Sequence, residues 1–111
     1  MLFTVIETRA FIRTTERFWT DEERAVFVNW IAANPAAGDV IVGSGGLRKV
    51  RWAAGGVGKR GGARVITYAM QHDGKVWLLV GYAKSKLENL PISFLVALRK
   101  EIDDATQDQK D

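Results

Sequence analysis

The chain of 111 residues contains no cysteine and a single histidine, His72. The absence of cysteine excludes a disulfide framework and thiolate metal sites, and one histidine cannot form a cluster with zinc-ligand spacing. No apolar run approaches the roughly 20 residues that span a bilayer, and the first residues lack the basic start and apolar run of a signal peptide. We therefore expect a cytoplasmic protein that uses no metal and no cofactor.

Acidic residues are missing from one long stretch of the chain. Between Asp39 and Asp73 lie 33 residues without a carboxylate, and six of them are lysine or arginine. Residues 40–87 carry nine basic side chains and one acidic one, whereas the rest of the chain carries seven basic and twelve acidic ones. Such an asymmetry attracts a polyanion to one region and discourages contact elsewhere. The sequence predicts a surface that binds phosphate.

The order of the predicted elements indicates a single domain of the α+β class over residues 1–111. We expect the helices to pack on one face of a mainly antiparallel sheet of three to four strands, which leaves the other face free to bind. The predicted elements are a strand over 2–6, helices over 8–17 and 20–34, strands over 47–53, 63–71 and 76–83, a helix from Pro91, and a frayed polar tail over 103–111.

Two helices carry clear signals. Thr20 followed by Glu23 is a capping-box pattern, and Asn34 precedes a proline and therefore avoids the helical region. Pro91 suits the first turn of the last helix. Apolar spacing predicts the buried stripes Val26, Phe27, Trp30 and Ile31 in the earlier helix, and Ile92, Leu95, Val96, Arg99 and Ile102 in the later one.

The basic residues of the first long strand alternate with apolar ones. This alternation places Lys49 and Arg51 together on one face, while Val50 and Trp52 point into the core on the other. The strand therefore predicts a pair of cations two residues apart on one face of the sheet.

The next two strands form a hairpin around His72-Asp73-Gly74, and they carry Arg64 near its start and Lys84 near its end. A loop of three or five residues would place Arg64 and Lys84 on the same face, and a loop of two or four on opposite faces. We predict an odd loop, which would gather Lys49, Arg51, Arg64 and Lys84 into one cluster.

The run GDVIVGSGGLRKVRWAAGGVGKRGGARVITY, with LLVGYAK after it, resembles the RelE-type toxins of bacterial toxin-antitoxin systems, in particular the HigB-like branch. The similarity covers residues 3–102, and its GGLRK and GKRGG elements are rather specific. It implies a RelE-like fold, a small antiparallel sheet flanked by helices, and an activity that cleaves mRNA in the ribosomal decoding site. It also implies a cognate antitoxin, expected to be HigA-like with a helix-turn-helix, and a toxin that is monomeric when free.

Carried over by motif, Lys49 and Arg51 match the cationic pair that faces RNA, and Arg64 matches the arginine that contacts the scissile phosphate. Lys84 falls where the family has a basic residue after the last strand. Better-known members have a catalytic tyrosine in the C-terminal segment, whereas residues 85–111 contain none. The resemblance therefore leaves the tyrosine's role unassigned.

Metal-independent cleavage of RNA needs an acceptor for the 2′-hydroxyl proton, stabilisation of an anionic transition state, and a donor for the leaving 5′-oxygen. A lysine surrounded by other cations loses its proton more easily than an isolated one. We therefore expect Lys49 or Lys84 to act as base or proton shuttle, Arg64 to clamp the scissile phosphate, and Arg51 to stabilise charge or protonate the leaving group. The expected RNA-binding residues are Arg48, Lys59, Arg60, Tyr82 and Lys86.

Two other function classes fit the same sequence. ParE-like toxins share this superfamily and act on DNA gyrase, but their sheet lacks the full set of cations. A non-catalytic RNA-binding module would use the cations equally well. For such a module, alanine variants would lose affinity gradually, whereas in an enzyme one or two positions should abolish cleavage while binding persists.

Overall fold

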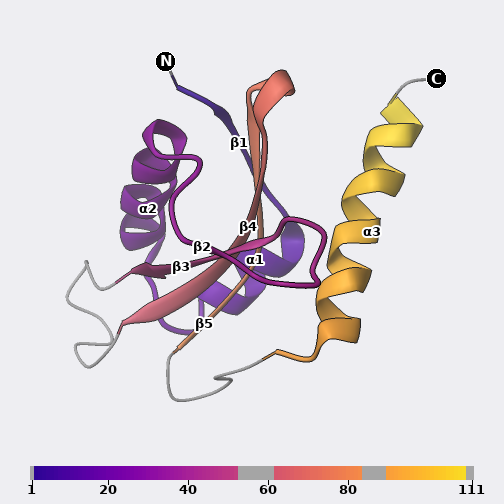
Figure 1. The fold of residues 1–111 in the computed structure, drawn as a ribbon. Helices are drawn as coiled ribbons and strands as arrows, with labels where there is room; N and C mark the ends of the chain where they lie inside the picture. Colours follow the sequence, from indigo (N-terminus) through magenta and orange to yellow (C-terminus); the bar gives the residue numbers. More distant parts are fainter. Residues whose placement is uncertain (1, 53–61, 84–89, 110–111) are drawn as a thin grey trace.

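The computed structural model describes residues 2–52, 62–83 and 90–109 (Figure 1). Its elements are, in order, β1 (Thr4–Glu7), α1 (Arg9–Thr15), α2 (Asp21–Ala33), β2 (Asp39–Val40), β3 (Arg48–Trp52), β4 (Ala63–Met70), the 3-10 turn η1 (Gln71–Asp73), β5 (Lys75–Ala83) and α3 (Ile92–Gln109).

The predicted strands all form, and the sheet gains one short strand. Its order is β1-β5-β4-β3-β2, in which β1 runs parallel to β5 and every other pair is antiparallel. The additional strand is β2, which pairs with β3 at the edge of the sheet. The α+β class is therefore confirmed, and the five strands are the predicted N-terminal strand, the three predicted long strands and β2.

The capping box of α2 forms as predicted. The hydroxyl of Thr20 accepts a hydrogen bond from the backbone N–H of Glu23 at 3.1 Å, and the Glu23 carboxylate accepts one from the Thr20 N–H at 2.8 Å. Phe27 and Ile31 are fully buried, whereas Val26 is 53% exposed. The prediction for Val26 was wrong because this helix buries a narrow stripe, and the residue one position before Phe27 lies outside it.

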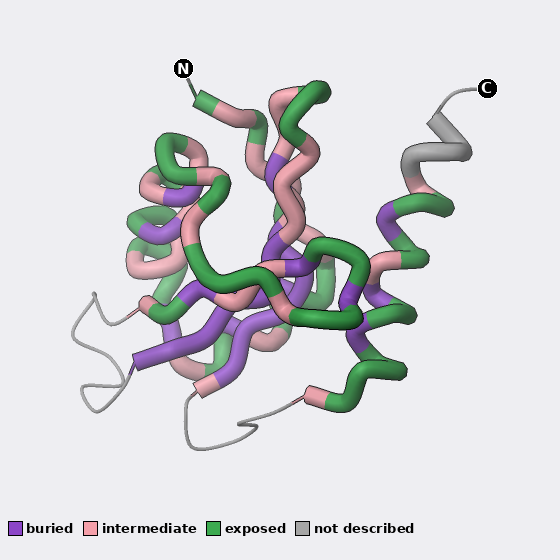
Figure 2. Tube along the Cα trace, in the orientation of Figure 1, coloured by how far each residue is buried: buried purple, intermediate pink, exposed green. Residues whose placement is uncertain are grey.

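Helices cover both faces of the sheet, which corrects the expectation that all would pack on one. On the first face, Phe11 of α1 and Phe27 of α2 pack against Val50 and Val65. On the second face, Leu95 of α3 packs with other apolar residues of α3 against β4 and β5. Figure 2 shows the buried strands between these layers. The apolar stripe of α3 needs a surface to bury itself, and the apolar residues of the second face provide it.

Helix α3 differs from the prediction in two ways: in which of its residues are buried, and in its length. Ile92 and Val96 are each 48% exposed, while Leu98 is 6% exposed and joins the core. The helix continues to Gln109, although the sequence predicted a polar tail from Asp103. Ion pairs four residues apart, from Arg99 to Asp103 and from Lys100 to Asp104, support this polar half of the helix.

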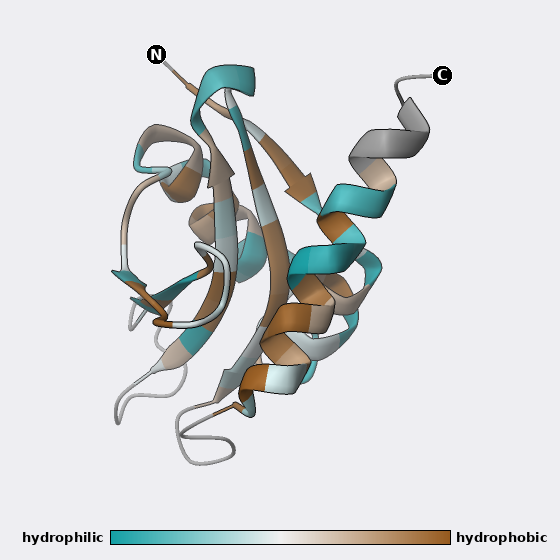
Figure 3. Cartoon of the chain, turned by 45° about the vertical axis from the view of Figure 1, so that its right-hand side comes forward, coloured by the Kyte–Doolittle hydropathy of each residue, from teal (hydrophilic) through white to brown (hydrophobic). Residues whose placement is uncertain are grey.

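Hydropathy along α3 also separates an apolar first half from a polar second half. The helix is mostly hydrophobic near its start and mostly hydrophilic toward its end (Figure 3). Within the described residues, no helix has the length and apolar character needed to cross a membrane.

Candidate functional site

The hairpin between β4 and β5 has an even loop, so the predicted odd loop was wrong. Met70 pairs with Lys75, which leaves the four residues 71–74 between the strands. Gly74 closes the turn in the left-handed region, with φ of 65°, where glycine carries no steric penalty. An even loop alone would have placed Arg64 and the side chain of Tyr82 on opposite faces of the sheet.

A β-bulge restores the shared face. Ile66 pairs with Val80 but Thr67 pairs with Leu78, so Leu79 is an extra residue in β5. A bulge of one residue reverses the alternation beyond it, and Arg64 consequently pairs directly with Tyr82.

Helix α1 stabilises the bulge through its threonines. The hydroxyl of Thr8 lies 2.8 Å from the carbonyl oxygen of Leu78 and 3.1 Å from that of Leu79. The N–H of Gly81 donates to the Thr14 hydroxyl at 2.9 Å. These side chains satisfy backbone groups of β5 at the irregular part of the ladder. The register that builds the site is therefore set partly from the opposite face of the sheet.

The result is a row of side chains across three strands. Arg51 pairs with Arg64, and Arg64 pairs with Tyr82. Directly paired residues share a face, with about 5 Å between their Cβ atoms. Lys49 precedes Arg51 by two residues on the same strand, and it lies on the same face. The sheet thus brings together three of the four predicted catalytic cations, and we call Lys49, Arg51 and Arg64 the cationic face.

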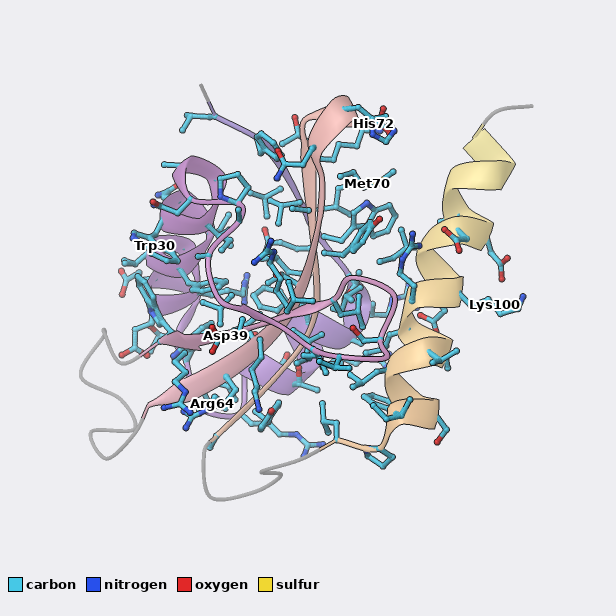
Figure 4. All side chains as sticks on the ribbon, in the orientation of Figure 1. Trp30, Asp39, Arg64, Met70, His72 and Lys100 are labelled. Carbon is cyan, nitrogen blue, oxygen red and sulfur yellow. The ribbon has the colours of Figure 1, made fainter. Side chains whose placement is uncertain are left out.

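The three cations differ in exposure. Arg51 is exposed and Lys49 is half-buried, whereas Arg64 is 6% and Tyr82 8% exposed. Figure 4 shows Arg64 on β4, at the end of the sheet near β3. The cationic face therefore combines one accessible guanidinium with one that is nearly covered.

A cavity of about 250 Å³ lies beside the cationic face. Lys49 and Tyr82 line it together with apolar side chains, among them Ile66 of β4 and Leu95 of α3. Because its walls are mainly apolar and Lys49 is one of the lining residues, the cavity suits a flat ring carried by an anionic chain.

Helix α3 is held beside this cavity by Arg99. Its guanidinium carbon lies 4.2 Å from the centroid of the Tyr68 ring, and one of its nitrogens donates to the Tyr68 hydroxyl at 3.0 Å. Another nitrogen donates to the carbonyl oxygen of Gly45 at 3.1 Å. Arg99 thus joins α3 to β4 and to the loop before β3.

Of the other predicted RNA-binding cations, the structure places Arg48 alone, and Arg48 is not on the cationic face. Arg48 alternates to the opposite face of β3, and its guanidinium donates to the carbonyl oxygen of Gly38 at 3.1 Å. The remaining four predicted residues, all basic, lie outside the described residues: Lys59, Arg60, Lys84 and Lys86.

Asp39 is a candidate site residue that is not among those predicted from the sequence. This residue pairs with Lys49 across β2 and β3, and it therefore lies on the side of the sheet that carries the cationic face. Figure 4 shows Asp39 beside β3, the strand that lies between β2 and β4. The available signal was its place at the start of the carboxylate-free stretch, but a strand of two residues has no alternation pattern to reveal it.

These features define a RelE-like fold with a cationic face. No family model matches the chain. Among solved structures, the free-state E. coli toxin RelE with two arginine-to-alanine substitutions superposes with a TM-score of 0.61. The match covers 89% of this chain and 98% of that chain, at 10% sequence identity. The predicted RelE-like fold is thereby confirmed, while the HigB-like branch stays a prediction.

Proposed function

We propose that this protein is the toxin of a toxin-antitoxin system and that it cleaves mRNA on the ribosome, in the cytoplasm, without a metal. The observation that carries the proposal is the direct pairing of Arg51 with Arg64, with Lys49 beside them. Like charges directly opposite each other destabilise a sheet. Three cations gathered on one face attract a polyanion, so the cationic face favours RNA as the ligand.

The cationic face supplies the electrostatic part of the reaction. The 2′-oxygen of a ribose attacks the adjacent phosphorus while the 5′-oxygen leaves, and negative charge accumulates on the phosphate oxygens between them. Arg51 is exposed and can hold these oxygens through its planar fork of donors. Arg64 is 6% exposed and presents little surface, which suits contact with a single phosphate oxygen.

The ribosome supplies positioning that three cations cannot provide. In-line attack requires the nucleophile, phosphorus and leaving oxygen to be aligned, and holding reactants in that geometry accounts for a large part of a catalysed rate. The cavity lined by Lys49 and Tyr82 lies beside the cationic face and can accept a base of the mRNA. The partner in the resting cell is a cognate antitoxin of the HigA-like type, and the free toxin is a monomer.

The test is cleavage of mRNA on programmed ribosomes by three alanine variants, Arg51→Ala, Arg64→Ala and Lys49→Ala. Removing one transition-state donor costs about 10²–10³-fold in rate, and we expect this loss in the two arginine variants while ribosome binding persists. Arg13→Ala is the matched control, because Arg13 is exposed on α1 against the other face of the sheet.

Three outcomes would contradict the proposal. Wild-type cleavage by both arginine variants would show that the cationic face does not catalyse. A gradual fall in RNA affinity with each charge removed, without any cleavage by the wild type, would indicate a binding module. Inhibition of gyrase supercoiling by the wild type, again without mRNA cleavage, would indicate a ParE-like toxin.

A further inference from the structure

Asp39 places a carboxylate next to the cationic face. Its direct partner across β2 and β3 is Lys49, and Lys49 lies two residues from Arg51 on the same face. Side chains paired in this way have Cβ atoms about 5 Å apart, so a carboxylate and an ammonium can contact the same small ligand. The proposed reaction needs a proton acceptor and a proton donor, and this pair offers one of each.

The backbone holds Asp39 in this position through Gly38. Gly38 has a φ of 91°, and a Cβ added there would lie 2.6 Å from the carbonyl oxygen of Lys49. A glycine is therefore required for β2 to approach β3 so closely. The guanidinium of Arg48 donates to the carbonyl oxygen of Gly38 at 3.1 Å and fixes the same point from β3.

The loop that follows β2 also holds the strand in place. The N–H of Ile41 donates to the carbonyl oxygen of Leu47 at 2.8 Å, which closes the loop immediately after Val40. The hydroxyl of Ser44 donates to the Ile41 carbonyl at 2.6 Å and accepts from the Leu47 N–H at 3.0 Å. Asp39 thus lies on a short strand fixed at both ends.

We infer that Asp39 is a catalytic residue, the proton acceptor for the 2′-hydroxyl, and that Lys49 is the proton donor for the leaving oxygen. This inference rests on the proposed function. In this assignment the carboxylate accepts one proton and the ammonium donates one. A lysine base, by contrast, would have to lose its proton before each turnover.

The protons balance over one turnover. Asp39 takes the proton of the 2′-hydroxyl as the bond from the 2′-oxygen to phosphorus forms. The bond from phosphorus to the 5′-oxygen breaks, and that oxygen takes a proton from the Lys49 ammonium. The products are a 2′,3′-cyclic phosphate and a free 5′-hydroxyl. The proton on Asp39 then passes to the neutral amine of Lys49, which restores both groups without a further reactant.

A simpler role for Asp39 gives the opposite result on substitution. If its charge only offsets that of Lys49, removing it makes the face more positive, and both RNA affinity and cleavage should rise. If Asp39 accepts the proton, its removal should lower cleavage about 10²–10⁴-fold although affinity is unchanged or higher. The direction of the change in rate therefore separates the two roles.

The experiment measures single-turnover cleavage on programmed ribosomes by Asp39→Asn, Asp39→Glu and Lys49→Ala. Each is assayed on normal mRNA and on mRNA whose leaving 5′-oxygen is replaced by sulfur. Sulfur leaves without being protonated. Cleavage of the modified mRNA by Lys49→Ala should therefore be restored to near the wild-type rate, whereas cleavage by Asp39→Asn should stay slow. Asp39→Glu keeps a carboxylate and should cleave about tenfold faster than Asp39→Asn.

The control is Asp73→Asn, which removes the same charge from the turn between β4 and β5.

Asparagine matches aspartate in shape and Asp39 is exposed, so the unfolding temperature of Asp39→Asn should equal that of the wild type. Near wild-type cleavage by Asp39→Asn, or its rescue by sulfur, would overturn this inference and leave the proposed function standing. Failure of the wild type to cleave would overturn both.

Discussion

The direct pairing of Arg51 with Arg64 should lower the stability of the fold, and replacing Arg51 tests this. If the two guanidinium groups lie about 7 Å apart, as cross-strand neighbours can, their repulsion is about 0.6 kcal/mol in bulk water and about 2.4 kcal/mol at an effective dielectric constant of 20. Arg51 is exposed, so its side chain can move away and water screens its charge. The lower part of this range therefore applies.

Arg51→Thr should raise the free energy of unfolding by about 0.5–1 kcal/mol, because threonine also favours strands. For a domain of this size the gain corresponds to an increase of about 2–6 °C in the unfolding temperature. The same variant should lose about 10²-fold or more in mRNA cleavage. A gain in stability combined with a loss of activity is the pattern expected where a site is kept for function.

Thermal unfolding at low and high salt measures the effect. At about 1 M salt the Debye length falls to about 3 Å, so the electrostatic part of the gain should disappear. Lys100→Ala is the control, because Lys100 lies on the outer side of α3 (Figure 4) and its ammonium lies 3.3 Å from the Asp104 carboxylate. It should give no gain. A lower unfolding temperature for Arg51→Thr at low salt would refute the argument that the paired arginines repel each other.

Two further predictions concern the sheet itself. Thr67 is fully buried and its hydroxyl has no hydrogen-bond partner among the described residues, so Thr67→Val should stabilise the fold by about 1 kcal/mol, measured by urea unfolding; a loss of stability would show that the hydroxyl is satisfied. Gly38→Ala should destabilise the fold by more than about 1 kcal/mol and slow cleavage, because the new Cβ would push β2 away from Lys49. Unchanged stability of Gly38→Ala would contradict the close approach of the two strands.

The sequence determined the features that depend on neighbouring residues along the chain. Alternation within one strand was sufficient to place Lys49 and Arg51 on the face opposite Val50. The capping box at Thr20 was also readable, because both of its partners lie within four residues. The carboxylate-free stretch predicted a cationic surface for the same reason: charge composition is a property of the chain itself.

Only the tertiary structure decided how those features meet. Whether Tyr82 shares the face of Arg64 depends on the bulge at Leu79, and Thr8 and Thr14, which lie far away in sequence, support that bulge. The place of Asp39 depends on the approach of Gly38 to Lys49, which no local pattern encodes. Strand periodicity is a local steric property, whereas register and the packing of α3 maximise buried apolar area and minimise unsatisfied backbone groups over the whole fold. The sequence thus determined which charges this protein has, and the packing decided which of them share a site.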